Sequence, residues 1–173
     1  MIEIRVVGAD EWRLWRRARL AALAGAPEAY RTRLAEWQGD GDREQRWRDR
    51  LSIPGAHDLL AVRAHEPIGI VTAVPDPEGD AARIISMWVD ESARGSGVGD
   101  RLITTLESWA AGNGYTTLSL GVFAGNEHAI GLYRRNGFEF LDEPGAPTPP
   151  PAADSAVDTR VERVMIKKLV PTG

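Results

Sequence analysis

The 173-residue chain contains no cysteine. Without thiols it can form no disulfide, no thiolate-ligated zinc site and no iron–sulfur cluster, and it cannot use a cysteine nucleophile. It also lacks an apolar run of about 18 residues, the length that would indicate a membrane-spanning helix. The residues from Met1 to Arg5 show neither the basic nor the apolar segment of a secretory signal. We therefore expect a cytoplasmic protein that does not insert into a membrane.

Acidic residues outnumber basic ones, with 25 Asp+Glu against 21 Lys+Arg and a net charge of −4. Non-specific binding to nucleic acid needs a basic face, so this balance argues against a nucleic-acid partner. Hydrophobic residues make up 43% and charged residues 27% of the chain, an ordinary globular composition. The length suits one domain, and we expect residues 1–173 to form it.

The spacing of apolar residues predicts the order of strands and helices. Alternation predicts strands over 2–6, 58–64, 68–74, 83–89, 116–122, 138–141 and 161–169. Helical spacing predicts helices over 11–24, 41–51, from the glycines at 95–99 to 111, and 126–135, with Asp10 and Asn126 as N-caps. The early strands should form antiparallel hairpins, whereas the strand–helix–strand segment 83–122 should be a right-handed parallel crossover. The fold class is therefore α/β, a mixed sheet with helices on both faces.

Three regions have a less specific pattern. Residues 142–160 include five prolines and predict a mobile loop. Residues 28–40 give no clear secondary structure, and Tyr30 or Trp37 in this region could line an acceptor cleft. The charged run 43–50 predicts a solvated helix face, and the tryptophans at 12, 15, 37 and 47 are expected to pack the helical layer.

A glycine cluster follows the strand at 83–89: Gly95, Gly97 and Gly99, preceded by Arg94. A tight turn that binds no ligand is one interpretation. A strand, a glycine-rich turn and a helix are also the arrangement that binds phosphate, because the first helical turn has unpaired N–H groups and a partial positive charge. The added arginine and the strongly amphipathic helix favour a phosphate ligand.

Two common phosphate motifs do not fit this cluster. A P-loop needs a glycine five residues after the first and then Lys-Ser/Thr, but Asp100 stands five residues after Gly95. The dinucleotide fingerprint needs a third glycine at the same place, so Asp100 departs from that pattern too.

The segment Arg94-x-x-Gly97-x-Gly99 matches the pattern Arg/Gln-x-x-Gly-x-Gly/Ala. It resembles the acyl-CoA pyrophosphate loop of the GNAT superfamily of N-acetyltransferases. A second segment, from Asn126 through Ala129, Leu132 and Tyr133 to Gly137-Phe138, is similar to that family's signature N-x-x-A-x-x-L-Y-x-x-x-G-F. The resemblance covers nearly the whole chain and is specific over 84–138. It implies a mostly antiparallel sheet of about seven strands, with a parallel, splayed pair at its centre.

The resemblance also implies a set of residues that bind acyl-CoA. The backbone amides around the glycines would bind the pyrophosphate, and the backbone of the preceding strand would pair with the pantetheine arm. The positions concerned are Trp88, Val89, Arg94, Gly95, Ser96, Gly97, Val98, Gly99 and Asp100. The Trp88 side chain is as well explained as a core aromatic. Asn126 can cap its helix, contact coenzyme A, or do both.

Tyr133 is the catalytic residue that the resemblance implies. When an amine attacks an acetyl thioester, a thiolate is expelled, and a phenol with an ordinary pKa of about 10 can protonate it. The alternative is a tyrosine that only packs against the core.

The general base stays open. Ser86, Asp90 and Glu91 lie on or just after the strand at 83–89, and Glu28, Glu36 and Glu139 are further candidates. Each carboxylate is also explained as a solvated surface charge. The three histidines, at 57, 65 and 128, are expected on the surface or in loops, and no metal site is predicted.

The predicted function is therefore an N-acetyltransferase with acetyl-CoA as co-substrate, which acylates a primary amine by direct attack in a ternary complex. The acceptor would be a small molecule or a peptide, and the net negative charge favours a cationic one. We expect a monomer or a homodimer, with no nucleic-acid or membrane partner. A non-catalytic acyl-CoA-binding module and a nucleotide-binding regulatory domain are the alternatives.

Overall fold

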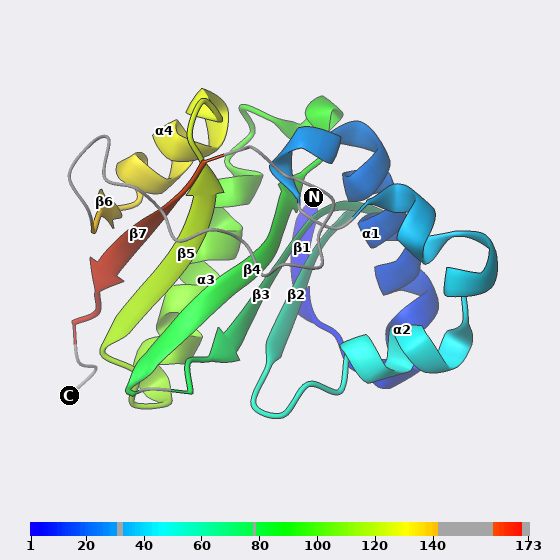
Figure 1. The fold of residues 1–173 in the computed structure, drawn as a ribbon, viewed down its shortest axis with the longest axis horizontal. Helices are drawn as coiled ribbons and strands as arrows, with labels where there is room; N and C mark the ends of the chain where they lie inside the picture. The colour runs from blue at the N-terminus through cyan, green and yellow to red at the C-terminus, as the bar shows by residue number, and fades with distance from the viewer. Residues whose placement is uncertain (31–32, 78, 142–160, 171–173) are drawn as a thin grey trace.

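Seven strands form one sheet in the order β1-β2-β3-β4-β5-β7-β6 (Figure 1). The computed structural model describes residues 1–30, 33–77, 79–141 and 161–170. The strands are β1 (Ile2–Val6), β2 (His57–Arg63), β3 (Glu66–Pro75), β4 (Ala81–Val89), β5 (Thr117–Phe123), β6 (Glu139–Phe140) and β7 (Glu162–Lys168). β4 and β5 pair in parallel and the other neighbours are antiparallel. The predicted mixed sheet with a central parallel pair is confirmed.

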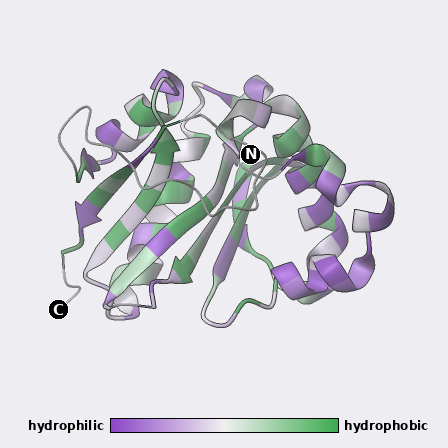
Figure 2. Ribbon diagram, in the orientation of Figure 1, coloured by the Kyte–Doolittle hydropathy of each residue, from purple (hydrophilic) through white to green (hydrophobic). Residues whose placement is uncertain are grey.

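Helices cover both faces of the sheet, as predicted (Figure 1). They are α1 (Trp12–Gly25), α2 (Glu44–Arg50), α3 (Val98–Gly112) and α4 (Glu127–Arg135). Leu59 and Ala61 of β2 belong to the core on the side of α3 and α4, whereas Leu60 and Val62 pack on the side of α1 and α2. This alternation follows from the two-residue period of a strand, and Figure 2 shows the hydrophobic residues concentrated along the strands.

None of the described helices is both long enough and apolar enough to cross a membrane.

The segment between α1 and α2 contains three 3-10 turns, at Pro27–Ala29, Leu34–Trp37 and Gly39–Gly41. They occupy the region for which the sequence gives no clear pattern. The predicted loop at 142–160 lies outside the described residues.

Two local predictions are wrong. Asp10 does not cap α1, because it lies inside a 3-10 turn at Ala9–Glu11 that leads into the helix, and its carboxylate pairs instead with Arg48 at 3.2 Å. The run 43–50 is not solvated throughout. Trp47 is fully buried and Arg50 turns toward the sheet, because α2 packs against α1 and the strands beneath it.

β4 and β5 separate toward their C-terminal ends, after which α3 and α4 follow. Their pairing runs from Ala81 opposite Thr117 to Ile84 opposite Leu120 and stops there. β4 then bends at a bulge against β3, where Thr72 pairs with Ile85 but Ile70 pairs with Trp88. Ser86, at the bulge, has a φ of +60°, an uncommon conformation for a residue other than glycine. The predicted splay of the central pair is thus built into the backbone.

Candidate active site

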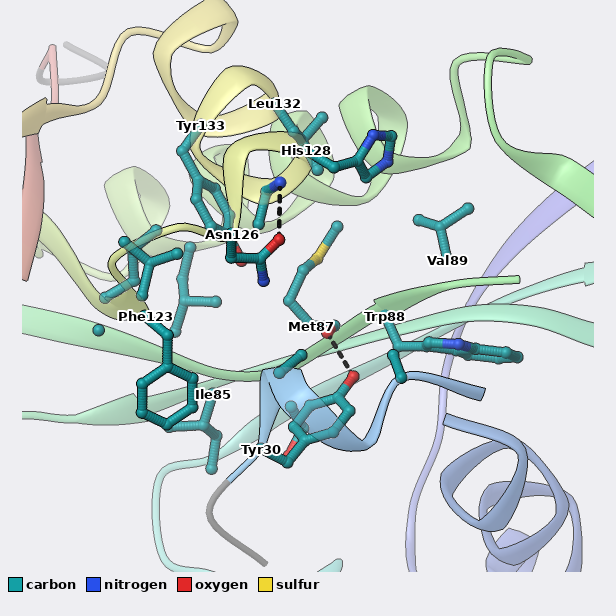
Figure 3. A pocket seen from close by; sticks show the side chains of 18 of the residues that line it. Tyr30, Ile85, Met87, Trp88, Val89, Phe123, Asn126, His128, Leu132 and Tyr133 are labelled. Atoms are coloured by element: carbon teal, nitrogen blue, oxygen red, sulfur yellow. Dashed lines mark hydrogen bonds between the residues drawn. The ribbon is translucent and has the colours of Figure 1, made fainter. Parts of the chain in front are cut away.

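The separation of β4 from β5 opens a cavity of about 220 Å³, which we call the donor cavity (Figure 3). Five of the residues predicted to bind acyl-CoA or to act in catalysis line it, and so does the candidate base Ser86; the five are Trp88, Val89, Arg94, Asn126 and Tyr133. The Trp88 indole belongs to the buried cluster beneath α1. Its packing supports the interpretation as a core aromatic, so a ligand contact of this residue would be made by its backbone.

A second cavity, of about 590 Å³, lies at the N-terminus of α3 and shares Val89, Arg94, His128 and Leu132 with the first. We call it the phosphate cavity. The other sequence-predicted residues that line it are Gly95, Gly97, Val98, Gly99 and Asp100. Ser96 is not among them, because its hydroxyl turns back and donates to the carbonyl of Ala93.

The three glycines of this loop have two different physical roles. Gly95 and Gly97 have φ of +79° and +84°, and a Cβ at either position would meet nothing within 4 Å. Glycine is needed at both positions because the backbone is left-handed there, and not because a side chain would lack space. Gly99 has an ordinary φ, but a Cβ there would lie 3.1 Å from Leu132 Cδ2, so this glycine lets α3 approach α4 closely.

The phosphate cavity fits a diphosphate. The N–H groups of Val98, Gly99 and Asp100 stand in the first turn of α3, where no acceptor exists within the helix, and the helix dipole adds positive charge. No side chain covers Gly95 or Gly97, and Arg94 supplies a cation at the rim. Backbone donors, open space and positive charge therefore coincide at the predicted loop.

The Asp100 carboxylate is engaged within the protein. It accepts two hydrogen bonds from Arg135, each at 3.1 Å, and one from Asn136 Nδ2 at 2.8 Å. These donors, Arg135 first, hold the pKa of Asp100 below its usual value. The carboxylate thus ties α3 to α4, and what Asp100 offers to a ligand is its backbone amide.

Tyr133 projects from α4 into the donor cavity, opposite Tyr30 (Figure 3). Its side chain is 6% exposed and packs edge-on against Phe138, with 5.9 Å between the ring centroids. Burial raises the pKa of the Tyr133 phenol. The hydroxyl is therefore protonated at neutral pH, in a position fixed by packing.

Asn126 caps α4, because its Oδ1 accepts a hydrogen bond from the Ala129 N–H at 3.3 Å. It also lines the donor cavity, so capping and contact with a ligand are compatible.

Two further residues, Tyr30 and His128, line the donor cavity. The Tyr30 hydroxyl donates to the carbonyl of Met87 at 2.7 Å and so ties the chain after α1 to β4 (Figure 3). His128, expected on the surface, is exposed but lines both the donor and the phosphate cavity. Tyr30 lies in a region without clear periodicity, and the sequence offered it, with Trp37, only as a candidate to line an acceptor cleft. The place of His128 inside the N-x-x-A signature could have indicated its position.

A third cavity, of about 420 Å³, lies against the bend of β4 on the side of α1 and α2. We call it the acceptor cavity. It shares seven lining residues with the donor cavity: Ala29, Tyr30, Ile84, Ile85, Ser86, Gly121 and Phe123. The remaining lining includes Arg19 from α1, Trp37, Arg50 from α2, and Arg83 and Glu162 from the sheet.

Arg50 is the centre of a buried polar network. Its guanidinium donates to Asp58 at 3.1 Å, to Thr72 at 3.1 Å and to Ser86 at 3.0 Å, and Thr72 donates to Asp58 at 2.7 Å. Burial lowers the pKa of Arg50 while Asp58 opposes that shift. The network joins α2 to β2, β3 and the bulge of β4, and so holds the floor of the acceptor cavity.

The candidate bases lie in different places. Ser86 lines both the donor and the acceptor cavity. Asp90 accepts from the Ser92 N–H at 3.1 Å, Glu36 accepts from the Arg33 N–H, and Glu139 pairs at the sheet edge in β6. Glu91 is exposed in the 3-10 turn after β4, and the side chain of Glu28 lies outside the described residues.

Glu162 is not among the bases predicted from the sequence. Among the described residues it is the carboxylate that lines the acceptor cavity. It lies close over Gly121, where a Cβ would meet its Oε1 at 1.8 Å. The absence of a side chain at Gly121 therefore makes room for this carboxylate.

Comparison with known proteins agrees with this geometry. The model of the acetyltransferase (GNAT) family matches residues 21–138. A curated relative, an IAA acetyltransferase from Azospirillum brasilense, is 32% identical over 88 residues, which are 51% of this chain and 58% of that protein. The match thus spans less than two thirds of that relative.

Solved structures share the fold. The PaiA N-acetyltransferase from Thermoplasma acidophilum, solved in complex with coenzyme A, has a TM-score of 0.72 at 17% identity, over 97% of this chain and 99% of that one. A ribosomal-protein-alanine N-acetyltransferase from Brucella melitensis has a TM-score of 0.67 at 24% identity, over 96% and 99%. At these identities the likeness concerns the architecture.

Proposed function

Because the chain belongs to the acetyltransferase (GNAT) family, we propose that it is an N-acetyltransferase that moves the acetyl group of acetyl-CoA to a primary amine. The reaction would be a direct attack within a ternary complex. One observation carries the proposal: the donor cavity joins the phosphate cavity on one side and the acceptor cavity on the other, with the Tyr133 side chain in its wall. Both substrates can therefore reach the same gap in the sheet.

The residues around the glycine loop would hold the donor. The amides of Gly97 to Asp100 would bind the diphosphate, with Arg94 as a fixed cation, and the β4 backbone at Trp88 and Val89 would pair with the pantetheine amides. Bound acetyl-CoA supplies the activated acyl group as a thioester. The coenzyme A in the Thermoplasma acidophilum structure supports this assignment.

Tyr133 would protonate the departing thiolate. An ordinary thiol has a pKa of about 8.5 and an ordinary phenol one of about 10, so the transfer is uphill by about 2 kcal/mol when both lie in water. Burial raises the pKa of Tyr133 further. It also raises that of a thiol leaving group in the same cavity, because desolvation disfavours both anions. The pKa of the Tyr133 phenol therefore rises together with that of the thiol to which it would donate its proton.

The attacking amine must first lose a proton. Glu162 and Ser86 are the described groups of the acceptor cavity that can accept or relay it. A carboxylate is the stronger base of the two, so we assign the proton to Glu162, through water.

The test compares Tyr133→Phe with Tyr115→Phe, a matched variant whose ring contacts Trp109 and lines none of the three cavities. We expect Tyr133→Phe to reduce kcat at least tenfold with amine acceptors while the Kd for acetyl-CoA stays unchanged. Tyr115→Phe should leave both constants unaltered. Unchanged turnover in Tyr133→Phe would remove this residue from the mechanism.

Thermal-shift measurements separate the alternative functions. Stabilisation by acetyl-CoA but not by ATP or NAD supports the proposal, and the reverse pattern indicates a nucleotide-binding domain. Stabilisation by acetyl-CoA without thiol release in the presence of any amine would indicate a non-catalytic acyl-CoA-binding module.

A further inference from the structure

Arg19 is a buried cation at the acceptor cavity, and it has no ion-pair partner among the described residues. The residue is 9% exposed, lies on α1 and is part of the cavity lining. Its Nη1 is buried and has no hydrogen-bond partner among the described residues. The contact recorded for the guanidinium is with the ring of Tyr30, with Cζ 4.7 Å from the centroid.

The neighbouring charges of the cavity are paired with one another. Arg50 Nη1 lies 3.1 Å from Asp58 Oδ1, and Arg83 Nη2 lies 3.7 Å from Glu162 Oε1. Among the described residues that line the cavity, Arg19 is thus the cation that neither of these carboxylates neutralises. The described lining therefore carries an excess positive charge.

An isolated buried charge is costly, and proteins rarely retain one without a partner. Burial, with a contribution from Arg50, lowers the pKa of Arg19 to about 10, so the guanidinium is still charged at neutral pH. A ligand that brings a negative charge would remove this cost. The flat fork of a guanidinium matches a carboxylate, to which it can donate two parallel hydrogen bonds.

The position of Arg19 relates that charge to the site of acyl transfer. Tyr30 contacts Arg19 through its ring and Met87 of β4 through its hydroxyl, so one tyrosine side chain separates the guanidinium from the bend of β4. Tyr30 and Trp37 give the cavity aromatic walls, and its volume is about 420 Å³. This space suits an acceptor of amino-acid size, with its amine toward β4 and its acid toward α1.

We infer that the acceptor is a small amine that bears a carboxylate, and that Arg19 binds this carboxylate. The inference rests on the proposed acyl transfer and specifies its substrate class. It differs from the expectation of a cationic acceptor, because the net charge of the chain does not describe this cavity.

The first test is a panel of L-amino acids and their amides, which keep the amine and lose the carboxylate, assayed with acetyl-CoA and thiol release as readout. At least one acid should show a kcat/KM ten or more times that of its amide. Arg19→Gln should abolish that preference and Arg19→Lys should retain part of it. Arg17→Gln, which removes an exposed charge from the same helix, should leave it unchanged.

The second test measures binding without turnover. Thermal shifts with L-phenylalanine and L-phenylalaninamide, at saturating coenzyme A, should show stabilisation by the acid alone, and Arg19→Met should remove it. The ligand-free Arg19→Met protein should also melt at a higher temperature than the wild type, because the buried charge is gone. This result would show that the variant folds.

The outcomes distinguish the two proposals. Amides used as well as acids, a preference that survives Arg19→Gln, or a panel in which no acid is bound or acylated would overturn the inference about the carboxylate. Absence of acetyl-CoA binding, or of thiol release with every amine, would overturn the proposed acyl transfer, and the binding measurement would still decide the role of Arg19.

Discussion

The donor half and the acceptor half of the site are built differently. Most of the donor half, from β4 through α3 and β5 to α4, comes from one continuous segment, 81–135, and only a part of the donor cavity wall, around Tyr30, comes from elsewhere. The groups proposed to face the ligand are largely backbone amides beside a glycine loop. The acceptor half combines α1, α2 and parts of three strands, and its polar groups are buried side chains such as Arg19 and Arg50. A site made from a local segment leaves a motif in the sequence, whereas one made from distant side chains does not.

The two halves should also differ in how much stability a substitution costs. In the donor half, first-turn amides and an exposed ion pair between Asp100 and Arg135 meet solvent, which screens their charges. In the acceptor half, charges lie in a low-dielectric interior where losing a partner is costly. Three variants test this contrast.

The largest effect is expected from Asp58→Ala. Asp58 is 3% exposed, and its removal leaves the Arg50 guanidinium, with a side chain 13% exposed, without its ion-pair partner. Breaking a buried pair in this way typically costs about 3–5 kcal/mol of the free energy of unfolding. Urea denaturation measures the loss. Glu66→Gln, which breaks the exposed pair with Arg17, is the control and should cost less than about 1 kcal/mol.

The same variant tests whether the halves are independent. Under conditions where Asp58→Ala is folded, its Kd for acetyl-CoA should equal that of the wild type. A large rise in that Kd would contradict the division into two halves.

An intermediate effect is expected from Gly97→Ala in the donor half. The residue has a φ of +84° and open space around a Cβ, so the variant should lose about 1–2 kcal/mol through backbone strain alone. The matched change is Gly131→Ala in α4, where a Cβ also meets nothing within 4 Å and φ is not positive. That variant should gain about 0.5–1 kcal/mol from helix propensity. Denaturation shifts of the same sign would contradict the role given to Gly97.

The smallest effect concerns Asp42, between α1 and α2. Its carboxylate accepts from Arg16 Nε at 2.7 Å and from Trp47 Nε1 at 2.8 Å, and these hydrogen bonds, Arg16 first, lower its pKa to about 2. Because the folded pKa lies below the unfolded one, the ionised carboxylate stabilises the fold above about pH 4. That contribution is lost as the pH falls toward 2.

The free energies of unfolding of the wild type and of Asp42→Asn should therefore differ most at pH 6 and converge by pH 2. A difference that stays constant with pH would show that the ion pair contributes nothing. The effect is modest because solvent reaches the carboxylate.

Comparing the two halves also explains which predictions held. The order of strands and helices along the chain and the parallel crossover follow from patterns within short segments, and the splayed central pair follows from the resemblance carried by residues 84–138. The structure confirms all three. The Asp10 cap and the solvated face at 43–50 were wrong because packing against distant elements decided them. The catalytic and ligand-binding roles themselves stay predictions until the variants are measured.

The order of apolar and polar residues alone determined the α/β architecture, because burial selects a two-residue period for strands and a longer one for helices. Glycines and a signature of about a dozen residues likewise predict where a phosphate-bearing donor would bind, since backbone amides need no distant partner. The tertiary structure alone decided the charge of the acceptor cavity. Arg19, Arg50 and Glu162 come together only when three separate parts of the chain meet, and which of their charges stays unpaired depends on distances that no local pattern encodes.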